Sequence, residues 1–415
     1  MTVTAVEGPL ARDLRAIAEG RQALPESKGR RHHFVPAFLL AAFAEPPGQR
    51  KGWMFQLDVR TGRPQRTKPD SAAFEKDLYA GEGDDLGDRS LEAFFSLVEK
   101  HTAPALKRLA DSPLALTAED RQTIAYFLSL QQSRTPAALS STIENSQAAM
   151  ELFLSVQFED AASFAKTYRE AVNDEASDQQ IENFRERMKD GLVNGEVSLA
   201  EPRSQALQLL LHTSAPIAET VASLRWTLVS SETQQFVTSD RGIAMHDPTP
   251  PFPWTGHAWR SSPNAQTTVP LGPWRCLLVE AGPAGMGVDI ASPSTVREVN
   301  LRTYGWAKRF VYGRTQSVVS DLRRDAKRKP RMVTRPKRTK QVLVEEADPS
   351  DPTVGAENVR RGWPKGYWEE DDDGNRRFMA YTVIDPSDRS TISSALTGGQ
   401  AAQRALANRK LGRER

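Results

Sequence analysis

The chain has 415 residues, of which 39% are hydrophobic and 26% charged, and its formal net charge is +2 at pH 7. This balance is typical of a folded globular protein and excludes a wholly disordered chain. No apolar run approaches the ~18 residues of a membrane span, and the N-terminus lacks a signal-peptide pattern. The single cysteine, Cys276, excludes an internal disulfide and a cysteine-based zinc cluster. We therefore expect a cytoplasmic protein that has no membrane contact.

The first half of the chain carries mainly the periodicity of helices. Apolar residues at helical spacing predict a short helix within 1–24 and a second helix within 32–44, which has Pro36 in its first turn and begins just after the His32-His33 pair. Residues 53–59 alternate between apolar and polar, which predicts a strand. Further helices are predicted over residues 91–109, 117–136, 143–190 and 203–223. Thr117 with Asp120 resembles a capping box at the start of the second of these.

The second half carries shorter, β-type runs. Trp226–Ser230 and Phe236–Ser239 are joined by a polar turn and predict a hairpin. Further elements are predicted as a strand at 276–280, a helix at 294–306, a strand at 309–312 and a strand at 378–384. The predicted fold class is α+β, predominantly helical with a small, mostly antiparallel sheet built mostly from residues 226–312.

Composition divides the chain into four predicted segments. These are an N-terminal helical extension (1–27), a core domain (28–322), a basic strip (323–344) and a weakly ordered linker with a small C-terminal appendage (345–415). Residues 323–340 hold ten Lys and Arg side chains and one Asp, so the rest of the chain is mildly acidic. Such a strip commonly contacts phosphate, although a solvated surface is an equal alternative. The predicted nucleic-acid contacts are Arg323, Arg324, Lys327, Arg328, Lys329 and Arg331.

Two groups of polar side chains could supply a base or a metal site. His33 lies just before the start of the helix predicted within 32–44, whose N-terminal partial charge favours a neutral imidazole that can act as base or ligand. A structural histidine bonded to the backbone is the alternative. Glu92 and Glu99 lie seven residues apart on one helix face and could hold a divalent cation such as Mg²⁺ or Mn²⁺. A solvated helix face is the alternative for this pair.

Two further groups lie at the ends of predicted elements. Gln131 lies on the buried stripe of its helix, and Arg134 lies on the same side. Burying an amide and a guanidinium costs roughly several kcal/mol unless each is paired. Their partner is either an internal carboxylate, Glu92 or Glu99, or a bound anion. Asp240 follows a short strand, where it could bind metal, act as a base or simply cap a turn.

The chain resembles the bacterial family called domain of unknown function 4238 over residues 28–315. The matching elements are His33–Phe43, Glu92 with Glu99, Gln131–Pro136, Phe236–Asp240, and Asn300 with Arg309–Tyr312. Ala37 and the pair Arg241-Gly242 depart from the family pattern. The resemblance implies that the polar residues of these elements belong to one site. It also implies an effector role, because some members are associated with bacterial defence against phage.

These observations lead to three hypotheses. The first is an intracellular effector that acts on nucleic acid as a metal-dependent nuclease in phage defence, with a possible phage-derived trigger. Its catalytic residues would be His33, Gln131, Arg134 and Asp240, and Glu92, Glu99 and Asp240 would hold the metal. The second is a non-catalytic binding or sensing module in which the same residues are structural braces. The third is an enzyme that acts on a nucleotide or a small metabolite.

Overall fold

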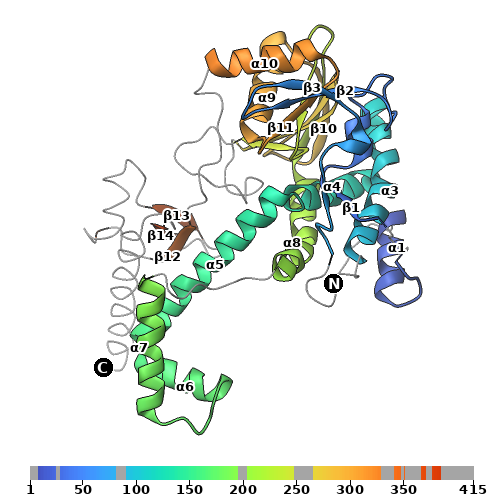
Figure 1. The fold of residues 1–415 in the computed structure, drawn as a ribbon. Helices are drawn as coiled ribbons and strands as arrows, with labels where there is room; N and C mark the ends of the chain where they lie inside the picture. Colours follow the sequence, from blue (N-terminus) through green and yellow to red (C-terminus); the bar gives the residue numbers. More distant parts are fainter. Residues whose placement is uncertain are drawn as a thin grey trace. The chain divides into compact units, whose positions relative to one another are not determined.

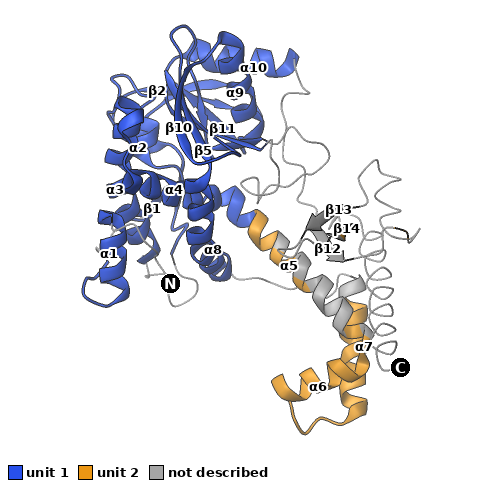
Figure 2. Ribbon diagram, turned by 180° about the vertical axis from the view of Figure 1, so that it is seen from behind, with its two compact units in different colours: residues 1–140, 202–337 blue, residues 141–201, 338–415 orange. Residues whose placement is uncertain are grey.

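The structure is a computed structural model. It describes residues 8–24, 29–80, 90–194, 203–246, 265–328, 341–346, 350, 366–370 and 376–384. The chain divides into two compact units, residues 1–140 with 202–337 and residues 141–201 with 338–415 (Figure 2). The predicted α+β class is confirmed. Within the described ranges, each helix is too short or too polar to span a bilayer.

Four helices of the first unit pack beside one another. They are α1 (Pro9–Ala18), α3 (Ser90–Asp111), α4 (Ala118–Ser133) and α8 (Arg203–Ser223). Helix α4 contacts both α3 and α8, so its apolar stripe is covered on two sides. The Thr117 hydroxyl accepts the amide of Asp120 at 3.1 Å and caps the start of α4, as the sequence predicts. The site residues at the end of α4 are therefore fixed by a long, capped helix.

Two sheets lie at the other end of the same unit (Figure 1). The five-stranded sheet has the order β10 (Gly285–Ile290), β5 (Arg225–Ser230), β9 (Arg275–Glu280), β8 (Gln266–Gly272) and β7 (Ala244–His246). Its pairs are antiparallel except β10 with β5. The four-stranded antiparallel sheet has the order β3 (Pro64–Thr67), β2 (Met54–Asp58), β11 (Phe310–Gly313) and β6 (Thr238–Ser239).

The hairpin predicted from Trp226–Ser230 and Phe236–Ser239 is wrong. Strands β5 and β6 belong to different sheets, and the segment 231–237 carries the chain from one to the other. Its ends are held by the β8–β9 turn, because the Ser231 amide donates to Trp274 O at 2.9 Å and the Phe236 amide to Pro273 O at 2.8 Å. These partners lie about forty residues further along the chain, so local spacing could not reveal them.

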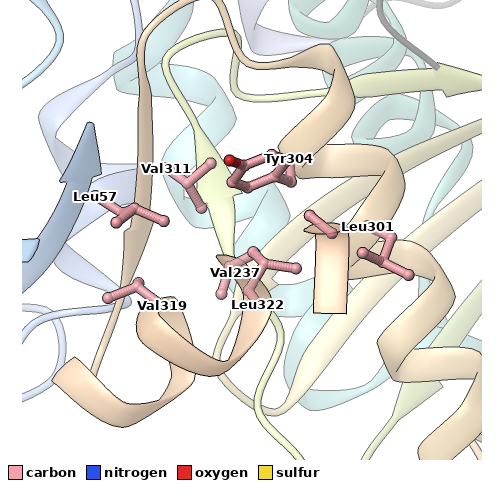
Figure 3. Close-up of a cluster of buried hydrophobic side chains, with 8 residues drawn as sticks. Leu57, Val237, Leu301, Tyr304, Val311, Val319 and Leu322 are labelled. Carbon is pink, nitrogen blue, oxygen red and sulfur yellow. The ribbon is translucent and has the colours of Figure 1, made fainter. Parts of the chain in front are cut away.

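Helices α9 (Pro293–Trp306) and α10 (Gln316–Arg328) cover the four-stranded sheet. The shared core contains buried side chains from both helices and from three strands or their ends: Leu57, Val237, Leu301, Tyr304, Val311, Val319, Leu322 and Ala326 (Figure 3). Truncating a fully buried aliphatic side chain such as Leu301 to alanine typically costs about 2–5 kcal/mol of stability. This core holds α10, which carries the start of the basic strip, firmly on the sheet.

The residues around the histidine pair form a strand, and the helix predicted after this pair is shorter than its apolar stripe indicates. Strand β1 (Arg31–His33) pairs antiparallel with β4 (Phe74–Lys76), and only the five-residue helix α2 (Ala37–Ala41) follows. Pro36 has an extended backbone and precedes α2. Because side chains alternate along a strand, His32 and His33 face opposite sides.

Helix α5 (Pro136–Glu159) begins in the first unit and continues into the second. There, α6 (Ala161–Ala171) and α7 (Asp178–Asn194) enclose a small core around Phe158, Phe164 and Ile181. A three-stranded antiparallel sheet has the order β12 (Gln341–Glu346), β14 (Arg376–Ile384) and β13 (Gly366–Glu370). The strand predicted at 378–384 is thereby confirmed, and the predicted tail beyond 384 lies outside the described residues.

Candidate functional site

Arg134, which follows the last turn of α4, places a buried guanidinium between β1 and α3. Its side chain is 1% exposed. Nε donates to Phe34 O at 3.2 Å, and Nη2 donates to His33 O at 3.3 Å and to Glu99 Oε1 at 2.8 Å. The guanidinium also lies 5.0 Å from the centre of the Phe95 ring. The sequence allows either an internal carboxylate or a bound anion as the partner of Arg134. The structure shows the internal carboxylate, Glu99, so Arg134 braces α3 against α4 and β1.

Gln131, one turn earlier in α4, ties three segments together. Its side chain is fully buried, and Nε2 donates to Phe34 O at 2.9 Å and to Arg241 O at 3.1 Å. A Cβ at Gly242, which has a φ of +73°, would lie 3.1 Å from the same nitrogen. Glycine is thus favoured there both by its backbone conformation and by the close approach of the amide. Gln131 holds the turn after β6 against α4, and this role is structural.

The two glutamates of α3 differ in their partners. Glu99 is paired with Arg134, whereas Glu92 makes no hydrogen bond or ion pair within the described part of the chain. Glu92 is partly buried. Burial, and then the negative charge of Glu99, raise the pKa of Glu92 to about 7, while the charge of Arg134 opposes the rise. Glu92 is therefore a carboxyl group that exchanges its proton near neutral pH.

Two neighbours of this cluster, Tyr79 and His32, are absent from the sequence-based site. The Tyr79 hydroxyl donates to Arg134 O at 2.8 Å, and its amide donates to His32 Nδ1 at 2.9 Å. The His32 and Tyr79 rings are stacked at 5.5 Å. Burial raises the pKa of Tyr79, and the charges of Glu92 and Glu99 add to this rise. No motif in the sequence marks Tyr79. An extended backbone at the histidine pair would have placed His32 and His33 on opposite sides of a strand, with His32 as the inward residue.

His33 faces away from Tyr79. Its Nδ1 lies 3.1 Å from Ala72 O, and its ring lies 5.8 Å from that of Phe74. A carbonyl only accepts, so Nδ1 carries the proton and Nε2 is left as an acceptor. Burial, and then the charge of Arg31, lower the pKa of His33. The sequence attributes a neutral imidazole to a helix N-terminus, but α2 begins only at Ala37. In the structure, the main cause of the lowered pKa of His33 is burial.

Asp240 is bound by the backbone of the segment that leads into β11. Its carboxylate accepts the amides of Lys308 at 2.9 Å, Arg309 at 2.6 Å and Phe310 at 2.9 Å. Burial raises the pKa of Asp240, and these amide donors oppose the rise. Both oxygens are occupied by amide donors, so the geometry favours the capping role over that of a base or a metal ligand.

The three-carboxylate metal site expected from Glu92, Glu99 and Asp240 is not formed. Among the residues that the structure describes, no group of three or more His, Cys, Asp or Glu side chains could hold a metal ion. Glu99 is engaged by Arg134, and Asp240 by backbone amides. The donor set therefore does not fit the proposed Mg²⁺ or Mn²⁺, and we derive no step through a metal.

The first residue of the basic strip has a structural role. The Arg323 guanidinium donates to Gly62 O at 3.0 Å and to Thr61 O at 3.3 Å, in the turn between β2 and β3. Gly62 has a φ of +69°, and a side chain there would collide with the guanidinium. Arg323 therefore anchors α10 to this turn, which leaves fewer of its donors for a phosphate.

The next basic residues differ in accessibility. Arg324 pairs with Asp321 at 2.6 Å on the surface of α10. Lys327 and Arg328, in its last turn, are exposed and make no ion pair within the described ranges. They are the described strip residues best placed for a phosphate. The other predicted contacts, Lys329 and Arg331, lie outside the described residues.

The sequence also matches a known family. The family described as "protein of unknown function (DUF4238)" matches residues 31–317, which is more than half of the chain, so the chain belongs to this family. The match includes β1, α3, α4, β6 and β11, the elements that position the residues described above. Comparisons with the curated proteins and with the solved structures gave no match.

Proposed function

We propose that this member of the DUF4238 family is a cytoplasmic enzyme that hydrolyses nucleic acid, with Glu92 as its proton-transfer group. The observation that carries the proposal is the partly buried Glu92 carboxyl, with a pKa raised to about 7 and no hydrogen-bond or ion-pair partner among the described residues. A group of this kind can both take and give a proton at neutral pH, as general acid–base catalysis requires.

The proposed step is hydrolysis of a phosphodiester. The Glu92 carboxylate takes a proton from the attacking water, whose oxygen forms a bond to phosphorus while the bond to the leaving oxygen breaks. The protonated Glu92 then gives the proton to the leaving oxygen, so the products are a phosphate monoester and a hydroxyl group. Because Arg134 directs its donors at protein groups, it acts as a positioning residue that holds Glu99 beside Glu92.

The class of substrate is supported by charge. Lys327 and Arg328 are exposed at the end of α10, and the strip continues with further basic residues in the sequence. Exposed Lys and Arg side chains bind the phosphate backbone whatever the base sequence. Some members of the family are associated with bacterial defence against phage. This association supports a role as a defence effector that a phage-derived trigger activates.

A second candidate function is a non-catalytic nucleic-acid-binding module. The observation that favours it is that Gln131, Arg134 and Asp240 all use their side chains to hold other parts of the protein. In that case the strip binds through charge alone. This candidate predicts binding with a strong salt dependence and no turnover.

The test is a cleavage assay on the purified full chain. Plasmid DNA, single-stranded DNA and RNA are incubated from pH 5 to 9 with Mg²⁺, Mn²⁺ or EDTA, for the unchanged protein, Glu92→Gln and Glu219→Gln. Glu219 is an exposed glutamate of α8 that makes no hydrogen bond or ion pair with the residues of the site, so it is the control. We expect cleavage to be lost in folded Glu92→Gln and retained in Glu219→Gln. Equal cleavage by both variants, or no cleavage of any substrate, would favour the binding module.

A further inference from the structure

A cavity of about 390 Å³ lies in the first unit, away from Glu92. Its walls come from the segment 231–237, the β8–β9 turn, α9 and α10. A volume of this size lies at the lower end of the range for small-molecule sites. No residue of the proposed catalytic cluster lines it. The cavity is therefore a site separate from the proposed catalytic cluster.

The walls of this cavity are fixed before any ligand arrives. Asn300 of α9 accepts the Val237 amide at 3.0 Å and donates to Gln235 O at 2.9 Å, so it clamps the segment 231–237. The β8–β9 turn holds the other end of the segment through Trp274 O and the Ser231 amide. Asn300 belongs to a family-matched element of the sequence, and its role is to shape this wall. A preformed wall lowers the entropic cost of binding.

The lining neutralises its own charges. Arg297 Nε lies 3.1 Å from Asp325 Oδ2, and Asp321 pairs with Arg324 at 2.6 Å. A ligand therefore meets a polar surface with no unpaired charge at these positions. Such a lining favours an uncharged group with hydrogen-bonding edges over a free anion or cation.

Two further features point to a flat, aromatic ligand with N–H donors. Trp274 is 39% exposed at the cavity and offers a ring for stacking. Gln235 lines the cavity, and its Oε1 atom is shielded from solvent and has no hydrogen-bond partner among the described residues, so a turn of the side chain would present this acceptor to a ligand. An orphaned buried acceptor is costly unless a ligand or water donates to it. A nucleobase supplies both a π-face and ring or exocyclic N–H donors.

Helix α10 connects this cavity with the basic strip. Asp321, Leu322 and Asp325 line the cavity, and Lys327 and Arg328 follow them in the last turn of the same helix. Asp325 and Arg328 are separated by a rise of only about 4.5 Å along the helix. Arg328 lies three residues after Asp325 and continues the face of α10 that lines the cavity, so a phosphate attached to a nucleotide in the cavity is within reach of its exposed guanidinium.

We propose that this cavity binds one unpaired nucleotide, with Trp274 stacking on the base, the Gln235 amide accepting from it, and Arg328 contacting its phosphate. The inference rests on the proposed action on nucleic acid and adds a subsite that holds the strand. The nucleotide belongs to a single strand or is a free nucleoside monophosphate, and the experiment separates these two sources.

The test is equilibrium binding by the full chain carrying Glu92→Gln, so that the probe is not cut. A fluorescent single-stranded 12-mer of DNA or RNA is titrated by anisotropy, and unlabelled nucleoside monophosphates are used as competitors. Trp274→Ala and Gln235→Ala are compared with Trp53→Ala. Trp53 is 42% exposed and lies under Arg66 and Lys68, so it is a tryptophan of matched exposure on another basic surface.

We expect Trp274→Ala to weaken binding of the strand by about 5- to 100-fold, the range for loss of one base–aromatic stack. Gln235→Ala should weaken it less, and Trp53→Ala should leave it unchanged. If a nucleoside monophosphate displaces the labelled strand, the cavity accepts a free nucleotide as its ligand. If no monophosphate displaces it, the ligand is a nucleotide within a single strand. Binding that is insensitive to Trp274, or that depends on Trp53 instead, overturns the inference even if the protein cleaves nucleic acid. Trp274-dependent binding without any cleavage by the unchanged protein upholds it and rejects the proposed hydrolysis.

Discussion

Glu92 and Glu99 lie on one face of α3, yet only Glu99 is paired with Arg134. The paired carboxylate is tied into the contact between α3, α4 and β1. Glu92 has no such partner, and it is partly buried beside the negative charge of Glu99. Burial, and then this charge, raise the pKa of Glu92 to about 7. A single ion pair therefore separates a structural glutamate from one whose pKa lies near neutral pH, although their spacing in the sequence makes them equivalent.

The raised pKa of Glu92 makes stability depend on pH. The folded state holds this proton up to about pH 7, whereas the unfolded state releases it near 4.5, so stability falls as the pH rises through this window. Glu92→Gln removes the charge and hence this fall. We expect the variant to be about 1–2 kcal/mol more stable than the unchanged protein at pH 8 and nearly equal to it at pH 4, where both states hold the proton. Urea unfolding at both pH values measures the difference, and an equal gain at both would contradict it.

The Arg134 side chain should prove necessary for the fold. Arg134→Ala leaves the Glu99 carboxylate without its ion-pair partner and removes one donor each from His33 O and Phe34 O, so we expect a loss of about 3–5 kcal/mol. Arg134→Lys should rescue little, because an ammonium group cannot reproduce the planar set of donors. Thermal and urea unfolding give the values.

The control for this brace is a double-mutant cycle with Glu99→Gln. If the two side chains act as a pair, the double variant loses less stability than the sum of the single variants. Additive losses would show that Arg134 stabilises the fold through its carbonyl contacts alone. An Arg134→Ala variant with unchanged stability and no cleavage would instead assign this guanidinium to the chemistry.

The sequence predicts those parts of the site that depend on local periodicity. The helical stripe of α4 places Gln131 and Arg134 on its buried side, and the cost of burying a guanidinium requires a partner, either Glu92 or Glu99 or a bound anion. Both inferences agree with the contact between Arg134 and Glu99. The capping of α4 by Thr117 is predicted for the same reason, since a cap and its helix are adjacent in the chain.

The rest of the site depends on contacts between distant segments. His32 and His33 form a strand because residues 74–76 pair with them, and this pairing decides which imidazole faces Tyr79. Asp240 is occupied by amides that lie 68–70 residues later in the chain. Strand pairing and backbone donors leave no pattern in the sequence near either residue, so spacing alone could not decide between a base and a brace.

Asp240 should behave as a structural cap. Asp240→Ala leaves the amides of Lys308, Arg309 and Phe310 without their acceptor, and we expect a loss of about 2–4 kcal/mol. Any cleavage activity should decline together with the folded fraction, as measured by circular dichroism and by the assay on the same sample. A folded Asp240→Ala protein that has lost all activity would return Asp240 to the chemistry.

The basic residues at the end of α10 should differ in their effect on nucleic-acid binding. For a single strand, the slope of log affinity against log salt should fall by about 1.4 when Lys327 and Arg328 are both changed to alanine, if each contacts one phosphate. Arg323→Ala should change this slope less and stability more, because its guanidinium holds the carbonyls of Thr61 and Gly62. Anisotropy titrations at four salt concentrations, with urea unfolding of each variant, separate the two effects. An unchanged slope in the double variant would mean that phosphate is bound elsewhere on the protein.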